Sequence, residues 1–406
     1  MTDQGRRVAL VLGTSTGGVG RHVAMLAGGL VRDGHRVVVA GPPSTERAFG
    51  FAALGARFAP VPISDRPRPA DDLRAVLALR ALRGADVVHA HGLRAGALAA
   101  IALAGTGTGL VVTLHNAATA GGAIGAVYGL LERIVARRAD RILVVSPDLG
   151  ERMTRLGAGR VEAAVVPAPP LPLSGRDPGD VRRELGAGDR VIFLTVARLA
   201  QQKGLETLLD VAKALRGAHG DAGAVPGSVE AEHVRGGPVP DLPKPASSSV
   251  ESVRGRGSRE RAPEVVFLVA GEGPLRGELQ GRIDRENLPV RLLGNRADVG
   301  DLLGVARALV VPSRWEGQPL TVQEALRAGT AVIATAVGGI PEMVGEAGLL
   351  VPYGDVAAMR DAVARVLADD GLAEGLAGAA ARRGRGLPGE PEALEAVLVV
   401  YAGLSG

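Results

Sequence analysis

Two glutamates stand eight residues apart in a stretch of the 406-residue chain that is rich in glycine and proline. Glu316 follows an apolar run that ends at Val311, and Glu324 comes after Pro319. This order predicts a strand, a loop that carries Glu316, and a helix that carries Glu324 and ends at Gly329. Open α/β sheets bind ligands at the carboxyl ends of their strands. Both carboxylates are therefore candidates to accept hydrogen bonds from hydroxyl groups of one ligand.

The start of the predicted helix offers a second kind of contact. The backbone N–H groups near residues 319–321 have no partner inside a helix, so they can bind an anion. Taken alone, two glutamates at this spacing are more often a solvated helix face. Two hydroxyl-binding carboxylates beside one phosphate site instead predict a pocket for a nucleotide sugar.

The residues around these glutamates carry a resemblance to a known family. Glu-Gly-Gln-Pro-Leu from Glu316, then Glu324-Ala325, and later Gly-Gly-Ile-Pro-Glu, resemble the donor-site signature of retaining family 4 glycosyltransferases of the GT-B fold. The resemblance implies that Glu316 holds hydroxyls of the donor sugar and that Glu324 holds the ribose. It also implies donor contacts from Gly317, Pro319 and Leu320.

The totals limit the classes of function. The length predicts two or three domains, and 46% hydrophobic with 22% charged residues is typical of a soluble globular protein. The absence of cysteine excludes disulfides and thiolate chemistry and fits a reducing cytoplasm, and no secretory signal is visible. A net charge of +4 allows the protein to contact the anionic inner face of the membrane peripherally. Five Phe, three Tyr and one Trp are few for stacking on bases, so no specific nucleic-acid partner is expected.

The first apolar run, residues 8–12, is followed by a loop rich in glycine and then by a helical pattern. The loop does not fit the Gly-x-Gly-x-x-Gly pattern of a dinucleotide site, and no acidic residue follows the second predicted strand at residues 34–40. It resembles the glycine loop of the family's N-terminal domain, which lies over the donor phosphates. The resemblance implies donor contacts from Gly17, Gly18 and Gly20, with a plain tight turn as the alternative.

Apolar runs at residues 86–90, 110–114 and 141–145 alternate with helical patterns, which predicts a doubly wound parallel sheet. His91 and His115 each follow one of these runs, so both should lie at the ligand-binding edge. A single histidine at a strand end is more often structural. The segments around both resemble motifs of the same family, and the resemblance implies that His115 approaches the reacting sugar.

A second strand, loop and helix unit carries Arg198 and Lys203. Two cations in one crevice would stabilise a diphosphate leaving group, because negative charge builds on it as the glycosidic bond breaks. Two solvated surface bases are the alternative. The Arg-Leu-x-x-x-Lys-Gly spacing resembles the family's diphosphate-binding motif, and the resemblance further implies nucleoside contacts from Gly271, Gly273 and Asn295.

A proline-rich linker at residues 165–175 separates the two units. We expect an N-terminal, acceptor-side domain over residues 1–170 and a donor-binding domain over residues 171–385. Residues 217–263 are rich in Pro, Gly, Ser and charge, which predicts a disordered insertion. Residues 386–406 are expected to form a helix that packs back on the first domain. The predicted fold class is α/β, with two Rossmann-like, doubly wound parallel-sheet domains that face a central cleft, as the GT-B resemblance implies.

The resemblance implies a retaining glycosyltransferase. It would move a hexosyl-type sugar from a nucleotide-diphosphate donor to a hydroxyl of a lipid, polyol, glycan or small metabolite. The catalytic candidates are His115, Arg198, Lys203 and Glu316. The resemblance implies no metal and no cofactor beyond the nucleotide-sugar co-substrate, with departure and attack on the same face of the sugar. The alternatives are a nucleotide-sugar epimerase of the same fold and a non-catalytic scaffold.

Overall fold

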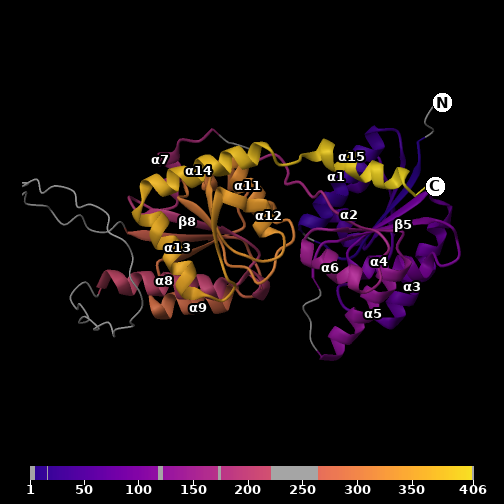
Figure 1. Cartoon of the computed structure of the whole chain (residues 1–406), viewed down its shortest axis with the longest axis horizontal. Coiled ribbons are helices and arrows are strands. Elements are labelled where there is room, and N and C mark those ends of the chain that lie inside the picture. Colours follow the sequence, from indigo (N-terminus) through magenta and orange to yellow (C-terminus); the bar gives the residue numbers. More distant parts are fainter. Residues whose placement is uncertain (1–4, 16, 118–121, 172–174, 221–263, 405–406) are drawn as a thin grey trace, which may run out of the picture.

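Two parallel β-sheets, each covered by helices on both faces, make up the computed structural model (Figure 1). It describes residues 5–15, 17–117, 122–171, 175–220 and 264–404. The strand orders are β3-β2-β1-β4-β5-β6-β7 and β10-β9-β8-β11-β12-β13. In both sheets the order reverses beside the first strand, which is the doubly wound topology. The predicted fold class is confirmed.

The first sheet is built from continuous apolar runs because helices bury it on both faces. Its strands are β1 (Arg7–Leu12), β2 (Arg36–Gly41), β3 (Arg57–Pro60), β4 (Val87–His91), β5 (Gly109–Leu114), β6 (Arg141–Val144) and β7 (Val161–Ala163). Its helices are α1 (Gly18–Arg32), α2 (Pro43–Phe49), α3 (Pro69–Leu79), α4 (Leu93–Ala102), α5 (Gly122–Arg138) and α6 (Pro147–Arg155). The edge strands β3 and β7 are not predicted by the sequence pattern, because their four and three residues are largely exposed and form no apolar run.

The second sheet repeats this plan. Its strands are β8 (Val191–Val196), β9 (Val265–Ala270), β10 (Val290–Gly294), β11 (Ala308–Val311), β12 (Ala331–Thr335) and β13 (Gly348–Val351). Its helices are α7 (Pro178–Glu184), α8 (Leu205–Gly220), α9 (Arg276–Glu286), α10 (Val299–Val305), α11 (Leu320–Ala328), α12 (Ile340–Val344), α13 (Val356–Ala368) and α14 (Asp370–Arg385). Helix α8 includes residues 217–220, which the composition places in the insertion; residues 221–263 lie outside the described part of the chain.

The last helix, α15 (Glu390–Ala402), leaves the second sheet and lies along α1 (Figure 1). Leu394 packs so closely on Gly29 of α1 that a side chain at position 29 would approach it to 2.8 Å. Tyr401 is fully buried within the first core, and the Arg6 guanidinium donates to its carbonyl oxygen at 2.6 Å. The end of the chain is therefore part of the N-terminal core.

Candidate functional site

The loops after β8 and β11 meet because these two strands are neighbours in the second sheet. Glu316 is 6% exposed, and its Oε1 accepts hydrogen bonds from the Lys203 Nζ at 2.6 Å and the Ser313 Oγ at 2.7 Å. The Gln202 amide donates to the carbonyl of Trp315 at 3.0 Å and so ties the same two loops together. The structure thus brings the predicted Glu316 and Lys203 into direct contact.

Two glycines in the left-handed region allow this close approach. Gly204 has φ +60°, and a Cβ there would overlap the carbonyl oxygen of Pro312. Gly338 has φ +55°, and a Cβ there would overlap the carbonyl oxygen of Glu316. Both positions require glycine for backbone conformation and for space. This gives a physical reason for the glycine after Lys203 and for the Gly-Gly pair in the donor signature.

Helix α11 places the second carboxylate. Pro319 occupies its N-cap position rather than its first turn, Leu320 begins the helix, and Gly329 ends it with φ +69°. Glu324 lies one turn beyond Leu320 and is half-buried. Burial raises the pKa of the Glu324 carboxyl, and the Arg21 and Arg327 guanidinium groups partly offset that rise. Arg21 comes from α1, so the N-terminal domain reaches this carboxylate.

The N-terminal domain also touches the start of α11 directly. A Cβ at Gly18 would lie 3.3 Å from the Leu320 side chain. The Trp315 indole donates to the Asp148 carboxylate at 2.8 Å, and Gly317 packs against Val145. Of the other two loop glycines, Gly17 is the N-cap of α1, with no atom within 4 Å of its Cβ position, and Gly20 packs against the Phe49 ring.

Two glutamines that the sequence pattern does not single out fasten α11 and the loop before it to the linker. The Gln318 amide donates to the Ala164 carbonyl at 2.6 Å and accepts from the Val166 N–H at 2.9 Å. Gln323, 2% exposed, makes the same pair of bonds with Val166 and Ala168. A glutamine on the buried side of a helix was the available signal, because a buried amide must find partners.

The remaining donor candidates lie along the same sheet edge. The loop after β8 and the turn after β9 pair through the Leu199 N–H and the Glu272 carbonyl at 3.0 Å, which sets Arg198 beside Gly271 and Gly273. The side chains of Arg198 and Asn295 are exposed. Within the described part of the chain, neither makes a hydrogen bond or ion pair with Lys203 or Glu316. The structure therefore joins Lys203 to Glu316, and among the described residues it joins Arg198 to neither.

His115 belongs to a cluster of four buried histidines, which we call the histidine cluster: His22, His89, His91 and His115. The His115 Nε2 lies 3.2 Å from the His91 Nδ1, and the His22 ring centre lies within 5.7 Å of both rings. His89 packs on His91 with 4.2 Å between ring centres. The sequence predicts His91 and His115 at the ligand-binding edge of the sheet, and the structure places His22 and His89 beside them.

The histidine cluster is neutral at pH 7. Burial lowers the pKa of His22 to about 4 and that of His89 to about 3, with repulsion from His22 adding to the second shift. Burial first, and neighbouring histidines second, hold the pKa values of His91 and His115 well below their ordinary range. Among the residues that the structure describes, no three His, Cys, Asp or Glu side chains are arranged to hold a metal ion.

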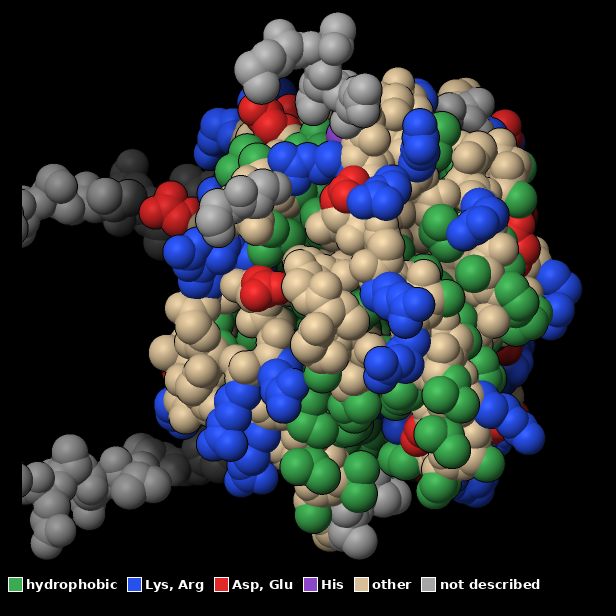
Figure 2. All heavy atoms as spheres, turned by 90° about the vertical axis from the view of Figure 1, so that its right-hand side faces the viewer, with side chains coloured by type: hydrophobic (Ala, Val, Ile, Leu, Met, Phe, Trp, Pro, Cys, Tyr) green, Lys and Arg blue, Asp and Glu red, His purple; other side chains and the backbone are tan. Residues whose placement is uncertain are grey.

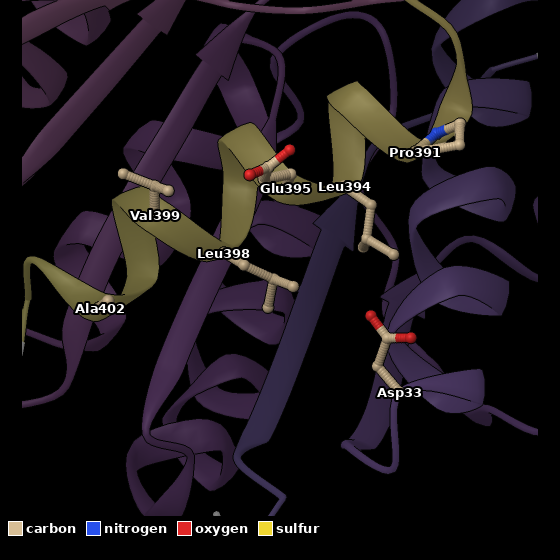
Figure 3. Close-up of a pocket in the computed structure, with 7 residues that line it drawn as sticks. All are labelled: Asp33, Pro391, Leu394, Glu395, Leu398, Val399 and Ala402. Carbon is tan, nitrogen blue, oxygen red and sulfur yellow. The ribbon is translucent and has the colours of Figure 1, made fainter.

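A separate groove of about 530 Å³ runs between α15 and the end of α1 (Figure 3). In the close-up, the side chains of Leu394 and Leu398 point toward α1, where Asp33 stands at the rim. None of its lining residues is a predicted site residue, and apart from Asp33 and Glu395 its lining is apolar. This groove is therefore not a candidate for the donor site, and the α11 region remains the candidate.

Two family models match the chain. The glycosyl transferase 4-like domain matches residues 17–169, and the glycosyl transferases group 1 model matches residues 248–369. The D-inositol 3-phosphate glycosyltransferase of Actinosynnema mirum is 30% identical over 332 residues, which cover 78% of this chain and 72% of that protein. The glycogen synthase of Mycobacterium tuberculosis is 28% identical over 411 residues, with 90% and 86% covered.

Solved structures share the architecture. The HepE protein of Anabaena, in complex with UDP-glucose, matches with a TM-score of 0.73 at 17% identity, over 98% of this chain and 100% of that chain. At this identity the likeness establishes the fold. Sequence matches in both halves and the two-sheet architecture agree: the chain belongs to the group 1 glycosyltransferases of GT-B fold, with a glycosyl transferase 4-like N-terminal domain.

Proposed function

We propose that this glycosyltransferase transfers a hexosyl-type sugar, with retention of configuration, from a nucleotide-diphosphate donor to a hydroxyl acceptor. The observation that carries the proposal is the buried Glu316, paired with Lys203 at 2.6 Å next to the start of α11. A carboxylate suited to sugar hydroxyls and a cation suited to phosphate thus share one position. The two would exchange partners when the donor binds.

In the proposed complex, each group meets the part of the donor that its chemistry favours. Lys203, Arg198 and the first N–H groups of α11 would stabilise the departing diphosphate. Glu316 would hold sugar hydroxyls, and Glu324 would hold the ribose. Since these cations and amides supply the charge that the leaving group needs, we expect the reaction to proceed without a metal. With no carboxylate nucleophile assigned, the acceptor would attack on the face from which the diphosphate leaves.

The remaining assigned residues frame the donor. Gly18 and its neighbours at the start of α1 would lie over the phosphates, and the turn at Gly271 and Gly273 would border the nucleoside together with Asn295. His115 would approach the sugar from the N-terminal domain. The Anabaena HepE protein was solved with UDP-glucose, so UDP-hexoses are the first donors to test.

The test is product analysis with a panel of nucleotide sugars. The protein is incubated with each donor, with and without acceptors from a cell extract, and products are identified by mass spectrometry and anomeric NMR. A glycoside with the donor's anomeric configuration supports the proposal. An altered nucleotide sugar formed without acceptor would support the epimerase instead, and no turnover with any donor would support a scaffold.

We also propose that the enzyme works in the cytoplasm against an anionic membrane surface. Among the described residues, no helix has both the length and the apolar character that crossing a bilayer requires. However, the outer sides of α3 and α5 expose large apolar residues next to arginines, and Figure 2 shows hydrophobic side chains gathered low on this face with basic ones around them. The exposed apolar residues are Leu73, Leu77, Val127 and Leu130, and the exposed arginines include Arg74, Arg80, Arg133 and Arg137.

An apolar strip flanked by arginines suits an interface of anionic lipids, where side chains insert and headgroups pair with charge. Sedimentation with phosphatidylglycerol vesicles should capture the protein, and phosphatidylcholine vesicles should not. Leu73→Ser with Leu77→Ser should abolish capture, while Val399→Ser, an exposed apolar residue on α15, should not. Equal capture of both variants would contradict this surface.

A further inference from the structure

A continuous set of contacts runs from the last helix to His115. The Tyr401 hydroxyl of α15 lies 2.8 Å from the His89 Nδ1, and the Thr113 hydroxyl lies 2.6 Å from the His89 Nε2. His89 therefore has both ring nitrogens occupied and cannot turn. Its ring packs on His91 at 4.2 Å, and His91 in turn meets His115.

The unpaired ring nitrogen of His91 indicates the tautomers of His91 and His115. The His91 Nε2 is buried and has no hydrogen-bond partner in the part of the chain that the structure describes. A buried N–H without an acceptor is rarer in proteins than a buried acceptor without a donor. The proton of neutral His91 is therefore on Nδ1, which donates to the His115 Nε2 at 3.2 Å. Neutral His115 must then carry its own proton on Nδ1.

We propose that His91 and Tyr401 are positioning residues that lock His115 as a neutral hydrogen-bond donor through its Nδ1–H. This rests on the proposed function, in which His115 faces the sugar. Since the His91 Nδ1–H occupies the Nε2 of His115, only Nδ1 remains for a ligand, and it donates. His115 then orients a sugar or acceptor oxygen and does not remove a proton. The C-terminal helix takes part because Tyr401 holds His89 in place beneath His91.

The tautomer is read directly by NMR of the full chain with ¹⁵N-labelled histidine. The chain has seven histidines, so each ring can be assigned by substitution. We expect the His115 proton on Nδ1 in the ligand-free protein at pH 7. A His115 proton on Nε2 would overturn the proposal. This measurement needs no donor, so it stands or falls separately from the transferase assignment.

Two substitutions at position 91 separate chemistry from packing. His91→Phe keeps a ring but removes the donor, so His115 should lose its fixed tautomer and kcat should fall about tenfold with KM little changed. His91→Asn places an amide N–H near the former Nδ1, so it should restore the tautomer and most of kcat. Equal loss in both variants, with an unchanged His115 tautomer, would show a structural role only.

Tyr401→Phe removes one hydroxyl and tests the far end of the contacts. The His89 Nδ1 would lose its partner, and the His91 and His115 ring resonances should broaden or shift. We expect a several-fold loss of kcat, the scale of one buried hydrogen bond. If the His91 and His115 resonances and kcat all match the parent protein, α15 has no part in the site. His35→Gln, outside the histidine cluster, is the control. It should change neither the His91 and His115 resonances nor kcat.

Discussion

At the scale of single residues, the buried pair of Glu316 and Lys203 is the most informative contact. The sequence predicts that both side chains face the donor, and in the structure they form an ion pair at 2.6 Å. A carboxylate that is 8% exposed as a side chain needs this counter-charge, because an unpaired buried charge is costly. A donor bound as we propose would therefore have to supply replacement partners to both groups at once.

Lys203→Met should lower kcat/KM by about two to three orders of magnitude, since losing one key electrostatic contact costs roughly 2–4 kcal/mol of transition-state stabilisation. Glu316→Gln should cost a similar amount. Lys213→Met is the matched control, because Lys213 also pairs with a glutamate, at 3.0 Å, but is 57% exposed. Steady-state kinetics with the identified donor would check all three. A Lys203→Met rate within threefold of the parent contradicts the assignment.

Glu324 illustrates a conflict between stability and function. Its pKa is raised by burial, so the folded state binds a proton more readily than the unfolded chain. The stability of the fold therefore decreases as pH rises above the ordinary glutamate pKa, and Glu324→Gln removes that penalty. The variant should therefore have a larger free energy of unfolding at pH 7 than the parent protein.

The same variant should raise the donor KM about tenfold, the scale of one hydrogen bond to a charged group. Thermal melting and donor titration on one sample separate the two effects. Glu278→Gln, on the exposed surface of α9, is the control and should alter neither. A stabilised Glu324→Gln variant with an unchanged KM would remove Glu324 from the ribose contact.

At the scale of elements, α11 links three parts of the molecule. Its first residue contacts the start of α1, Gln323 and the preceding Gln318 hold the linker, and the loop before it carries Glu316. The amides of Gln318 and Gln323 supply the linker backbone with bonds that a strand neighbour would otherwise provide. We infer that these hydrogen bonds fix the backbone conformation of the linker.

Gln323→Leu should destabilise the fold by about 1–3 kcal/mol, because the N–H of Ala168 and the carbonyl of Val166 lose their partners. Gln280→Leu on α9 is the control, since the Gln280 amide pairs with Asp284 on the exposed surface. Denaturant unfolding would give both values. If the two substitutions cost the same, the linker does not depend on Gln323.

The sequence predicts the local elements of the fold but not the contacts between residues that are far apart in the chain. Buried parallel strands such as β8 and β11 are continuous apolar runs, and Gly329 ends α11 in the left-handed conformation, so local pattern was sufficient. Glycine and proline positions located the Glu316 loop. The partnership of Tyr401 with His89 spans 312 residues and depends on where α15 returns, so no local pattern carries it.

At the scale of the whole molecule, the histidine cluster makes stability depend on pH. The pKa of His22 is about 4 and that of His89 about 3 in the folded protein, below the ordinary value of 6.5. The unfolded chain therefore takes up protons first, and stability falls as pH drops below about 6.5. Each histidine contributes a slope of about 1.4 kcal/mol per pH unit in that range.

Denaturant unfolding at several pH values from 7.5 to 5 would measure the slope. His22→Leu should make it shallower by about one histidine, without loss at pH 7.5, because the buried His22 Nδ1 has no partner to lose among the described residues. The His35→Gln control should keep the parent slope. A stability that does not change between pH 7.5 and 5 would mean that water reaches these rings.

The chain passes between its two halves twice, once between β7 and α7 and again between α14 and α15. A domain that is connected at two separate points can rotate about the line through these points. It cannot rotate freely about either connection alone. The two domains should therefore open and close by a hinge rotation about the line that joins the two connections. One angle would then describe the opening and closing of the two domains.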